Sequence, residues 1–255
     1  MLHITVVTFL LSILPSFVLS LQCYNCQERI QLNYLVTSET VPSISTQCEL
    51  VNSSICSVDV IWDLKTNTSA ISVSTEALKG RDVVPNRLGV YLLLDIRSNN
   101  ITNDWQHVFY YDGNLIEKGN DEVNLKKLLR SLSIEERFQQ EIVPLIQVIP
   151  SFDPKTANCS EFRRHDFECP RRDLTTCSRC FAFVNQTATE EKVCATCPYE
   201  SEPLNSVVRY KTFFSTNLTV DADATFLTCQ QHGCNSVENV NRVKQAGKIT
   251  FNLFI

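Results

Sequence analysis

The sequence has few of the residues from which catalytic motifs are built: its 255 residues include only six glycines and four histidines. The glycines are all isolated, which excludes the G-x-G-x-x-G, P-loop and G-x-S-x-G motifs of phosphate-binding and hydrolytic sites. No H-E-x-x-H occurs, and His107, His165 and His232 are scattered along the chain. His107 lies in an aromatic strand pattern, where a packed histidine is expected. We therefore expect no enzymatic activity and no cofactor.

Positive charge and long apolar runs are also scarce. The net charge of −5 and the pI near 5.4 exclude the basic footprint of a nucleic-acid-binding domain. One basic cluster, at residues 163–172, is interleaved with acidic residues and indicates a solvated mixed face. Beyond residue 20 no run reaches the roughly 18 residues that a transmembrane helix needs. Lys248 and Asn252 interrupt the apolar end of the chain, so a lipid anchor is not expected either.

The first 20 residues are the exception, because they are nearly uncharged and apolar from residue 4 to 14. Pro15 breaks this run, and short side chains precede residue 21. This pattern is typical of a signal peptide, which would leave Leu21 as the first residue of a secreted, extracellular protein.

Twelve cysteines divide the chain into two Cys-rich ends around a Cys-free centre at residues 57–158. In an oxidising compartment an even number of cysteines at this density predicts six disulfides, although the sequence does not give their pairing. The cysteines are Cys23, Cys26, Cys48, Cys56, Cys159, Cys169, Cys177, Cys180, Cys194, Cys197, Cys229 and Cys234.

Two metal interpretations compete with this one. The spacing Cys177-x2-Cys180-x13-Cys194-x2-Cys197 is close to that of a zinc ribbon, although behind a signal peptide disulfides are favoured. Asp221 could coordinate calcium with its neighbour two residues on, Asp223, but two carboxylates in a turn are usually only a turn. We expect no metal at either place.

The Cys-free centre predicts a ββαα unit. Residues 87–96 and 105–111 are apolar, aromatic runs that end at turn signals, as strands do. From residue 123 to 132 the apolar period becomes helical, and a capping-box pattern at 133–136 predicts a second helix that Pro144 ends or kinks. The segments that flank this unit predict strands at 57–63, 69–74, 181–184, 192–193, 207–214 and 224–228.

Six N-x-S/T sequons predict N-glycosylation. Two lie in predicted hairpin tips and a third lies between the central strands, where an acceptor would be exposed. The six are Asn52, Asn67, Asn100, Asn158, Asn185 and Asn217.

The opening L-Q-C-Y-N-C at residues 21–26 and the late L-T-C-Q-Q-H-G-C-N at residues 227–235 together resemble the urokinase-receptor and lymphocyte-antigen family of three-finger proteins, which includes protectin and snake toxins. The resemblance implies a Cys229–Cys234 bond and a buried Asn235 that is hydrogen-bonded near the amino-terminal strand. It also implies that Cys26 pairs with Cys48. Thr228 departs from the pattern, since many members carry a cysteine there.

The implied fold class is α+β, a disulfide-rich three-finger-like β module carrying the ββαα unit as an insert. The domains expected are the signal peptide (1–20), an N-terminal Cys-rich part (21–80), the insert (81–155), a C-terminal Cys-rich part (156–240) and a tail or strand (241–255). Two Cys-rich modules around a central domain are the alternative. The single module is favoured because the diagnostic start and end each occur once.

The family implies a secreted, glycosylated, non-enzymatic protein that binds an extracellular protein or receptor, with no nucleic-acid partner. Two alternatives stay open: a zinc protein or enzyme using the Cys177 to Cys197 cluster, and a carrier of a small apolar ligand held between the central strands and helices.

Overall fold

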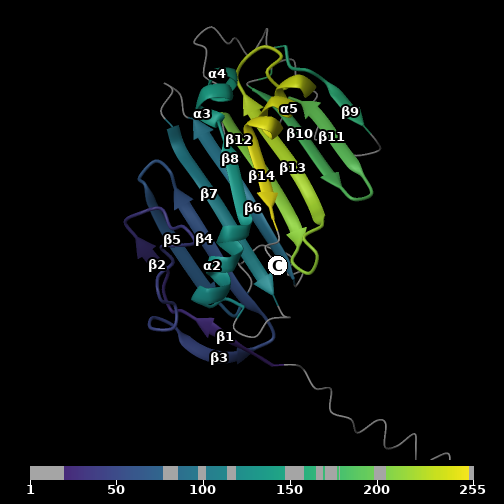
Figure 1. The fold of residues 1–255 in the computed structure, drawn as a ribbon. Coiled ribbons are helices and arrows are strands. Elements are labelled where there is room, and N and C mark those ends of the chain that lie inside the picture. The colour runs from purple at the N-terminus through teal and green to yellow at the C-terminus, as the bar shows by residue number, and fades with distance from the viewer. Residues whose placement is uncertain are drawn as a thin grey trace, which may run out of the picture.

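A computed structural model describes residues 20–76, 86–96, 102–113, 119–146, 158–164, 169, 177, 179–197 and 205–252. The chain is mostly β-sheet, with few helices and six disulfides. Ten strands form one antiparallel sheet in the order β2-β5-β4-β7-β6-β12-β13-β10-β11-β9 (Figure 1). These strands are β2 (Ile30–Leu32), β4 (Cys56–Asp63), β5 (Thr68–Ser74), β6 (Arg87–Ile96), β7 (Thr102–Gly113), β9 (Phe162–Arg164), β10 (Cys180–Thr187), β11 (Glu191–Thr196), β12 (Asn205–Phe214) and β13 (Val220–Cys229).

A second layer lies across one face of this sheet (Figure 1). It contains α2 (Glu122–Ser131), α3 (Phe138–Glu141), α4 (Val143–Ile146), α5 (Val237–Ala246) and the antiparallel pair of β8 (Leu132–Glu136) with β14 (Gly247–Phe251). Each long helix begins at a side-chain cap that accepts a backbone N–H, Asp121 for α2 and Ser236 for α5. A further pair, β1 (Leu21–Asn25) with β3 (Glu49–Ser53), forms its own small sheet.

The core lies between the two layers. Alternate residues of β6, including Leu92 and Leu94, are fully buried, as the period of a strand requires. They share one apolar cluster with Leu125 of α2 and Val243 of α5. The predicted strands and the predicted helix at 123–132 correspond to β4, β5, β6, β7, β10, β11, β12, β13 and α2.

The sheet order has a two-fold pattern. β6 and β12 pair at its centre, and outward from them β7 matches β13, β4 matches β10, and β5 matches β11. In the second layer α2 and β8 of the first half match α5 and β14 of the second, and β8 pairs with β14. The chain therefore runs twice through the same succession of strands and helix.

Two buried asparagines make this equivalence specific. Asn120 accepts from the Tyr24 backbone N–H (2.9 Å) and donates to the carbonyls of Tyr24 (2.8 Å) and Ser57 (3.2 Å). Tyr24 and Ser57 directly follow Cys23 and Cys56, which form a disulfide. One side chain thus joins the start of the first half to its central strands.

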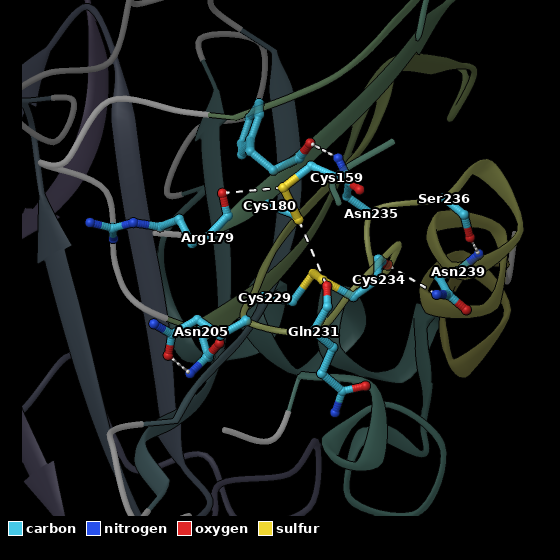
Figure 2. The surroundings of a disulfide bond; sticks show 12 residues. Cys159, Arg179, Cys180, Asn205, Cys229, Gln231, Cys234, Asn235, Ser236 and Asn239 are labelled. Atoms are coloured by element: carbon cyan, nitrogen blue, oxygen red, sulfur yellow. Dashed lines mark hydrogen bonds between the residues drawn. A yellow bond between two sulfur atoms is a disulfide. The ribbon is translucent and has the colours of Figure 1, made fainter. Parts of the chain in front are cut away.

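Asn235 repeats this arrangement in the second half. It accepts from the Ser160 N–H (2.8 Å) and donates to the carbonyls of Ser160 and Phe181 (both 2.9 Å). Ser160 and Phe181 directly follow Cys159 and Cys180, again a disulfide pair (Figure 2). The expectation that Asn235 bonds near the amino-terminal strand is corrected, because that role belongs to Asn120.

The expected single module with an insert is also corrected. Its strands at 87–96 and 105–111 are β6 and β7, which lie in the middle of the continuous sheet rather than in a separate unit. The disulfides Cys23–Cys56 and Cys26–Cys48 close within the first Cys-rich end and do not reach the second. The boundaries expected at residues 80 and 155 therefore do not delimit a separate layer or sheet.

The predicted second helix at 133–143 is wrong in its first half. Residues there form β8, in which Ser133 and Glu135 are exposed while Ile134 is half-buried opposite Ile249. Residues 133–136 fit both a capping box and the alternation of a strand. Pairing with β14 stabilises the strand. Only the short α3 and α4 follow. At the other end of the chain, part of the expected tail is β14.

Candidate binding face

The sheet face opposite the helices carries a patch of apolar side chains, here called the aromatic face. Its six residues come from five neighbouring strands and are all half-buried: Ile61, Leu93, Val108, Val208, Tyr210 and Phe226. Strand register places Val108 beside Ile61 and Val208 between Leu93 and Phe226. The Tyr210 ring stacks on Tyr91 at 4.3 Å between centroids, and its hydroxyl lies 3.1 Å from that of Tyr110. The patch is therefore continuous across the junction of the two halves.

The border of the aromatic face is acidic. Asp95 of β6 lies directly opposite Asp104 of β7, and Asp63 ends β4 on the same side. Burial, together with the neighbouring Asp104 charge, raises the pKa of Asp95 to about 6. One oxygen of Asp95 is buried with no hydrogen-bond partner among the described residues. Like charges at directly opposed positions of a sheet destabilise it, so this border has a cost in stability.

Asp95→Asn is expected to stabilise the protein at neutral pH. Because the folded-state pKa lies above the ordinary value of 3.8, the native carboxyl contributes most below about pH 4 and loses that contribution as the pH rises through about 6. The substitution should raise the free energy of unfolding by about 1 kcal/mol at about pH 7.5, after allowance for the half-exposed site, and by nearly nothing at about pH 4. Urea unfolding at both values tests this. Equal differences at the two would contradict it.

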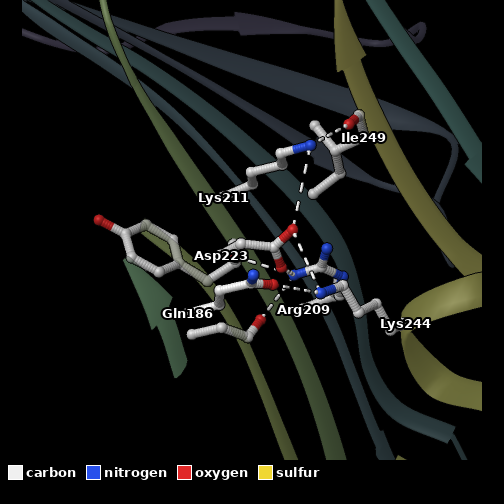
Figure 3. A network of polar contacts seen from close by, with 8 residues as sticks. Gln186, Arg209, Lys211, Asp223, Lys244 and Ile249 are labelled. Atoms are coloured by element: carbon white, nitrogen blue, oxygen red, sulfur yellow. Dashed lines mark hydrogen bonds and ion pairs between the residues drawn. The ribbon is translucent and has the colours of Figure 1, made fainter. Parts of the chain in front are cut away.

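On the helix-covered face a charged cluster is buried in the second half (Figure 3). Asp223 forms an ion pair with Arg209, whose side chain is only 3% exposed, and lies 3.7 Å from Lys244 and 4.0 Å from Lys211. Arg209 also donates to the Ala224 carbonyl at 2.8 Å. Burial lowers the pKa of Lys211, an effect that the Asp223 charge opposes.

This cluster corrects the calcium interpretation of Asp221 and Asp223. Both residues lie within β13 rather than in a turn. Asp221 forms an ion pair with Arg87 at 3.1 Å. The charge of Asp223 is balanced by the side chains of Arg209, Lys211 and Lys244. Neither carboxylate has the oxygen-rich surroundings that calcium requires.

The first half has a smaller cluster of polar side chains on the helix-covered face. Glu136 accepts from the Trp105 indole (2.9 Å) and from the Phe138 backbone N–H, and lies 3.6 Å from His107. Burial alone would raise the pKa of Glu136, but hydrogen bonding to His107, Phe138 and Trp105 lowers it. His107 is thus packed beside a carboxylate. His232 accepts from the Asn158 backbone N–H, and His165 lies outside the described residues.

The zinc interpretation of the second Cys-rich end is also corrected. Cys177 pairs with Cys197, Cys180 with Cys159, and Cys194 with Cys169, so the four proposed ligands belong to three different disulfides. Such sulfurs are no longer thiolates and cannot close a zinc site. The remaining bonds are Cys23–Cys56, Cys26–Cys48 and Cys229–Cys234. Within the described part of the chain, His, Cys, Asp and Glu side chains form no metal-ligating group of three.

The sequons differ in their surroundings. Asn52, Asn67, Asn158 and Asn217 are exposed, and Asn67 lies in the β4–β5 turn at φ 56°. Asn185 is half-buried inside β10, opposite Lys192, so its placement in a hairpin tip is corrected. Asn100 lies outside the described residues.

In the basic cluster, Arg163 and Arg164 belong to β9, while Arg171 and Arg172 are not among the described residues.

Two features of the site escaped the sequence. No sequence motif marks Asn120. Its role becomes clear only when its hydrogen bonds are compared with those of Asn235. The acidic border depends on the register that sets Asp95 against Asp104, which a sequence does not show. The missed helix α5 did leave a signal, because Val237, Val240 and Val243 follow the capping residue Ser236 at intervals of three.

None of the described helices is long and apolar enough to span a bilayer. Comparison of the chain with protein-family models, with curated proteins and with solved structures finds no match. The functional proposal therefore depends on the sequence and the geometry of this chain.

Proposed function

We propose that this protein is a secreted, N-glycosylated, non-enzymatic extracellular binding protein made of two three-finger-type modules that share one sheet. The observation that carries the proposal is the aromatic face with its acidic border. The partner is an extracellular protein whose contact surface is apolar at its centre and basic at its rim.

The three-finger interpretation is supported by the repeated framework. Each half has a Cys-bonded first segment followed by two β-hairpins, β4–β5 and β6–β7 in the first half and β10–β11 and β12–β13 in the second. In each half the last strand is followed by a buried asparagine that bonds back to the first disulfide's neighbours. In this proposal the two segments that carry the family resemblance lie in different modules. Residues 21–26 begin the first module, and residues 227–235 end the second.

The extracellular assignment is supported by six disulfides, with no free cysteine among the described residues. Disulfides at this density persist in oxidising compartments and are rare in the cytosol. The four exposed sequons are compatible with glycan attachment. Asn67 and Asn158 lie in loops, outside the aromatic face, so glycans there would leave it open.

Binding through the aromatic face is supported by its composition. Contiguous apolar side chains on a sheet face mark interaction sites, and aromatic residues are enriched at the centres of protein interfaces. The charged groups buried under the helices are engaged with one another, as in Arg209 with Asp223. The carboxylates Asp63, Asp95 and Asp104 favour a basic partner and disfavour face-to-face contact with a second copy.

A paired substitution tests this proposal. The secreted protein is screened against a panel of extracellular proteins. Each binder is retested with Leu93→Glu, which places a charge at the centre of the aromatic face. The matched control is Val123→Glu on α2, where the native side chain is 54% exposed on the opposite layer. We expect binding to fall at least tenfold with Leu93→Glu, because a charge is buried without a partner, and to be unchanged with Val123→Glu.

The folded state of both variants is checked by secretion yield and near-UV circular dichroism. A binder that responds equally to both variants, or a panel in which nothing binds, would contradict the proposal.

A further inference from the structure

A cavity of about 180 Å³ lies in the second layer at the junction of the two halves. The first half supplies Leu88 of β6, Tyr111 of β7 and one side of α2. The second half supplies Phe251 of β14 and the turn between β12 and β13. The complete lining is Leu88, Tyr111, Gly119, Asn124, Lys127, Leu128, Ser131, Ser215, Leu218 and Phe251.

The walls of this cavity are apolar and firmly held. Leu88 and Tyr111 face each other in the register of β6 and β7 and are almost completely buried. The Phe251 ring packs against Phe109 (6.1 Å between centroids) and, edge to face, against Phe213 (5.2 Å). Walls of this kind keep their shape when the space between them is not filled by protein.

The turn that closes one side is strained. Leu218 has φ 52°, a left-handed backbone conformation that non-glycine residues rarely adopt. Its N–H donates to the Phe214 carbonyl at 2.8 Å, and its side chain packs against the core cluster while lining the cavity. Strain of this kind persists where surrounding contacts impose it, and it is frequent at ligand sites.

The rim is polar and carries one positive charge. Lys127 of α2 is exposed, and among the described residues no carboxylate lies within ion-pairing distance of it. Ser131 lies one helical turn further along the same face and donates to the Lys127 carbonyl at 2.9 Å. Ser215 adds a hydroxyl from the second half. An apolar interior with a single ammonium group at its mouth matches a molecule with an apolar body and an anionic end.

We propose that this cavity binds a small amphipathic carboxylate, whose apolar body is about the size of a benzene ring and whose carboxylate contacts Lys127. An apolar cavity of roughly 150 Å³ holds benzene, so the volume here accommodates a ring or a short alkyl chain and little more. The cavity lies on the layer opposite the aromatic face, so this site is independent of the protein-binding proposal.

The test is a titration of the full secreted protein, followed by NMR, with phenylacetate, hexanoate and the neutral benzyl alcohol. We expect saturable binding of phenylacetate, and Lys127→Gln should weaken it about five- to tenfold while leaving benzyl alcohol unchanged, because only the carboxylate loses a charged partner. Ser131→Phe should abolish binding of all three by filling the cavity. Hexanoate binding tighter than that of phenylacetate would assign an alkyl rather than an aromatic body within the same proposal.

Two matched variants control for unrelated effects. Lys126→Gln removes the neighbouring charge, which does not line the cavity, and Ser133→Phe adds the same ring at an exposed position of β8. Both should bind phenylacetate as the native protein does. The proposal is overturned if none of the three probes binds saturably, or if Lys127→Gln, an exposed change that preserves the fold, leaves phenylacetate affinity unaltered.

Discussion

Asn120→Ala and Asn235→Ala are each expected to lower the free energy of unfolding by about 3 to 5 kcal/mol. Both side chains are completely buried and satisfy one backbone N–H and at least two carbonyls. Alanine would leave these groups buried without partners, and each such group costs about 1 to 3 kcal/mol. Denaturant unfolding of the disulfide-intact protein measures both effects.

The control is Asn241→Ala, an exposed position of α5, where a change within about 0.5 kcal/mol is expected. The equivalence of the two halves requires that Asn120→Ala and Asn235→Ala have similar effects. If only one of them were as mild as Asn241→Ala, the two halves would not be built on the same framework.

Asp223→Ala is expected to lower the free energy of unfolding by about 3 to 5 kcal/mol, because it leaves the buried Arg209 charge uncompensated. Asp221→Ala, two residues along the same strand, removes a more exposed ion pair with Arg87 and should cost less than about 1 kcal/mol. Thermal unfolding of the two variants side by side measures the difference.

The double variant Arg209→Leu with Asp223→Ala should recover most of the lost stability, because replacing both partners of a buried pair by apolar groups is often nearly neutral. Lys211 and Lys244 are 17% and 35% exposed, so both can still reach water. A double variant as unstable as Asp223→Ala would mean that the ion pair is not the source of the effect.

The strands and the first helix of this fold could be predicted because local periodicity determines them. The alternation in β6 and the helical spacing in α2 are each complete within about ten residues. The prediction for the region after Leu132 was wrong because the same short pattern fits a helix start and a strand. Pairing with β14, more than a hundred residues away, selects the strand.

The two-fold arrangement could not be predicted from spacing. Cys23 and Cys56 are 33 residues apart, whereas their counterparts Cys159 and Cys180 are 21 apart, so no fixed period exists. The second half also has a Cys229–Cys234 bond between its last strand and Asn235, while the first half reaches Asn120 from Gly113 without cysteines. Only the hydrogen bonds show that the two asparagines are equivalent.

The candidate site was less accessible to sequence analysis. Cysteines and sequons are recognised directly from the residue types, so the sequence alone was enough to locate them. The aromatic face exists because five strands from both halves lie side by side. The cavity exists because α2 and the turn between β12 and β13 line the same space. Both depend on contacts between residues far apart in the chain, which neither composition nor periodicity encodes.

The central claim is that the chain consists of two modules, each with its own disulfide framework. Mapping the disulfides of the secreted, deglycosylated protein by non-reducing peptide mass spectrometry tests it most directly. The account predicts Cys23–Cys56 and Cys26–Cys48 in the first module, and Cys159–Cys180, Cys169–Cys194, Cys177–Cys197 and Cys229–Cys234 in the second. A bond from Cys23 or Cys26 to any cysteine beyond residue 150 would contradict it.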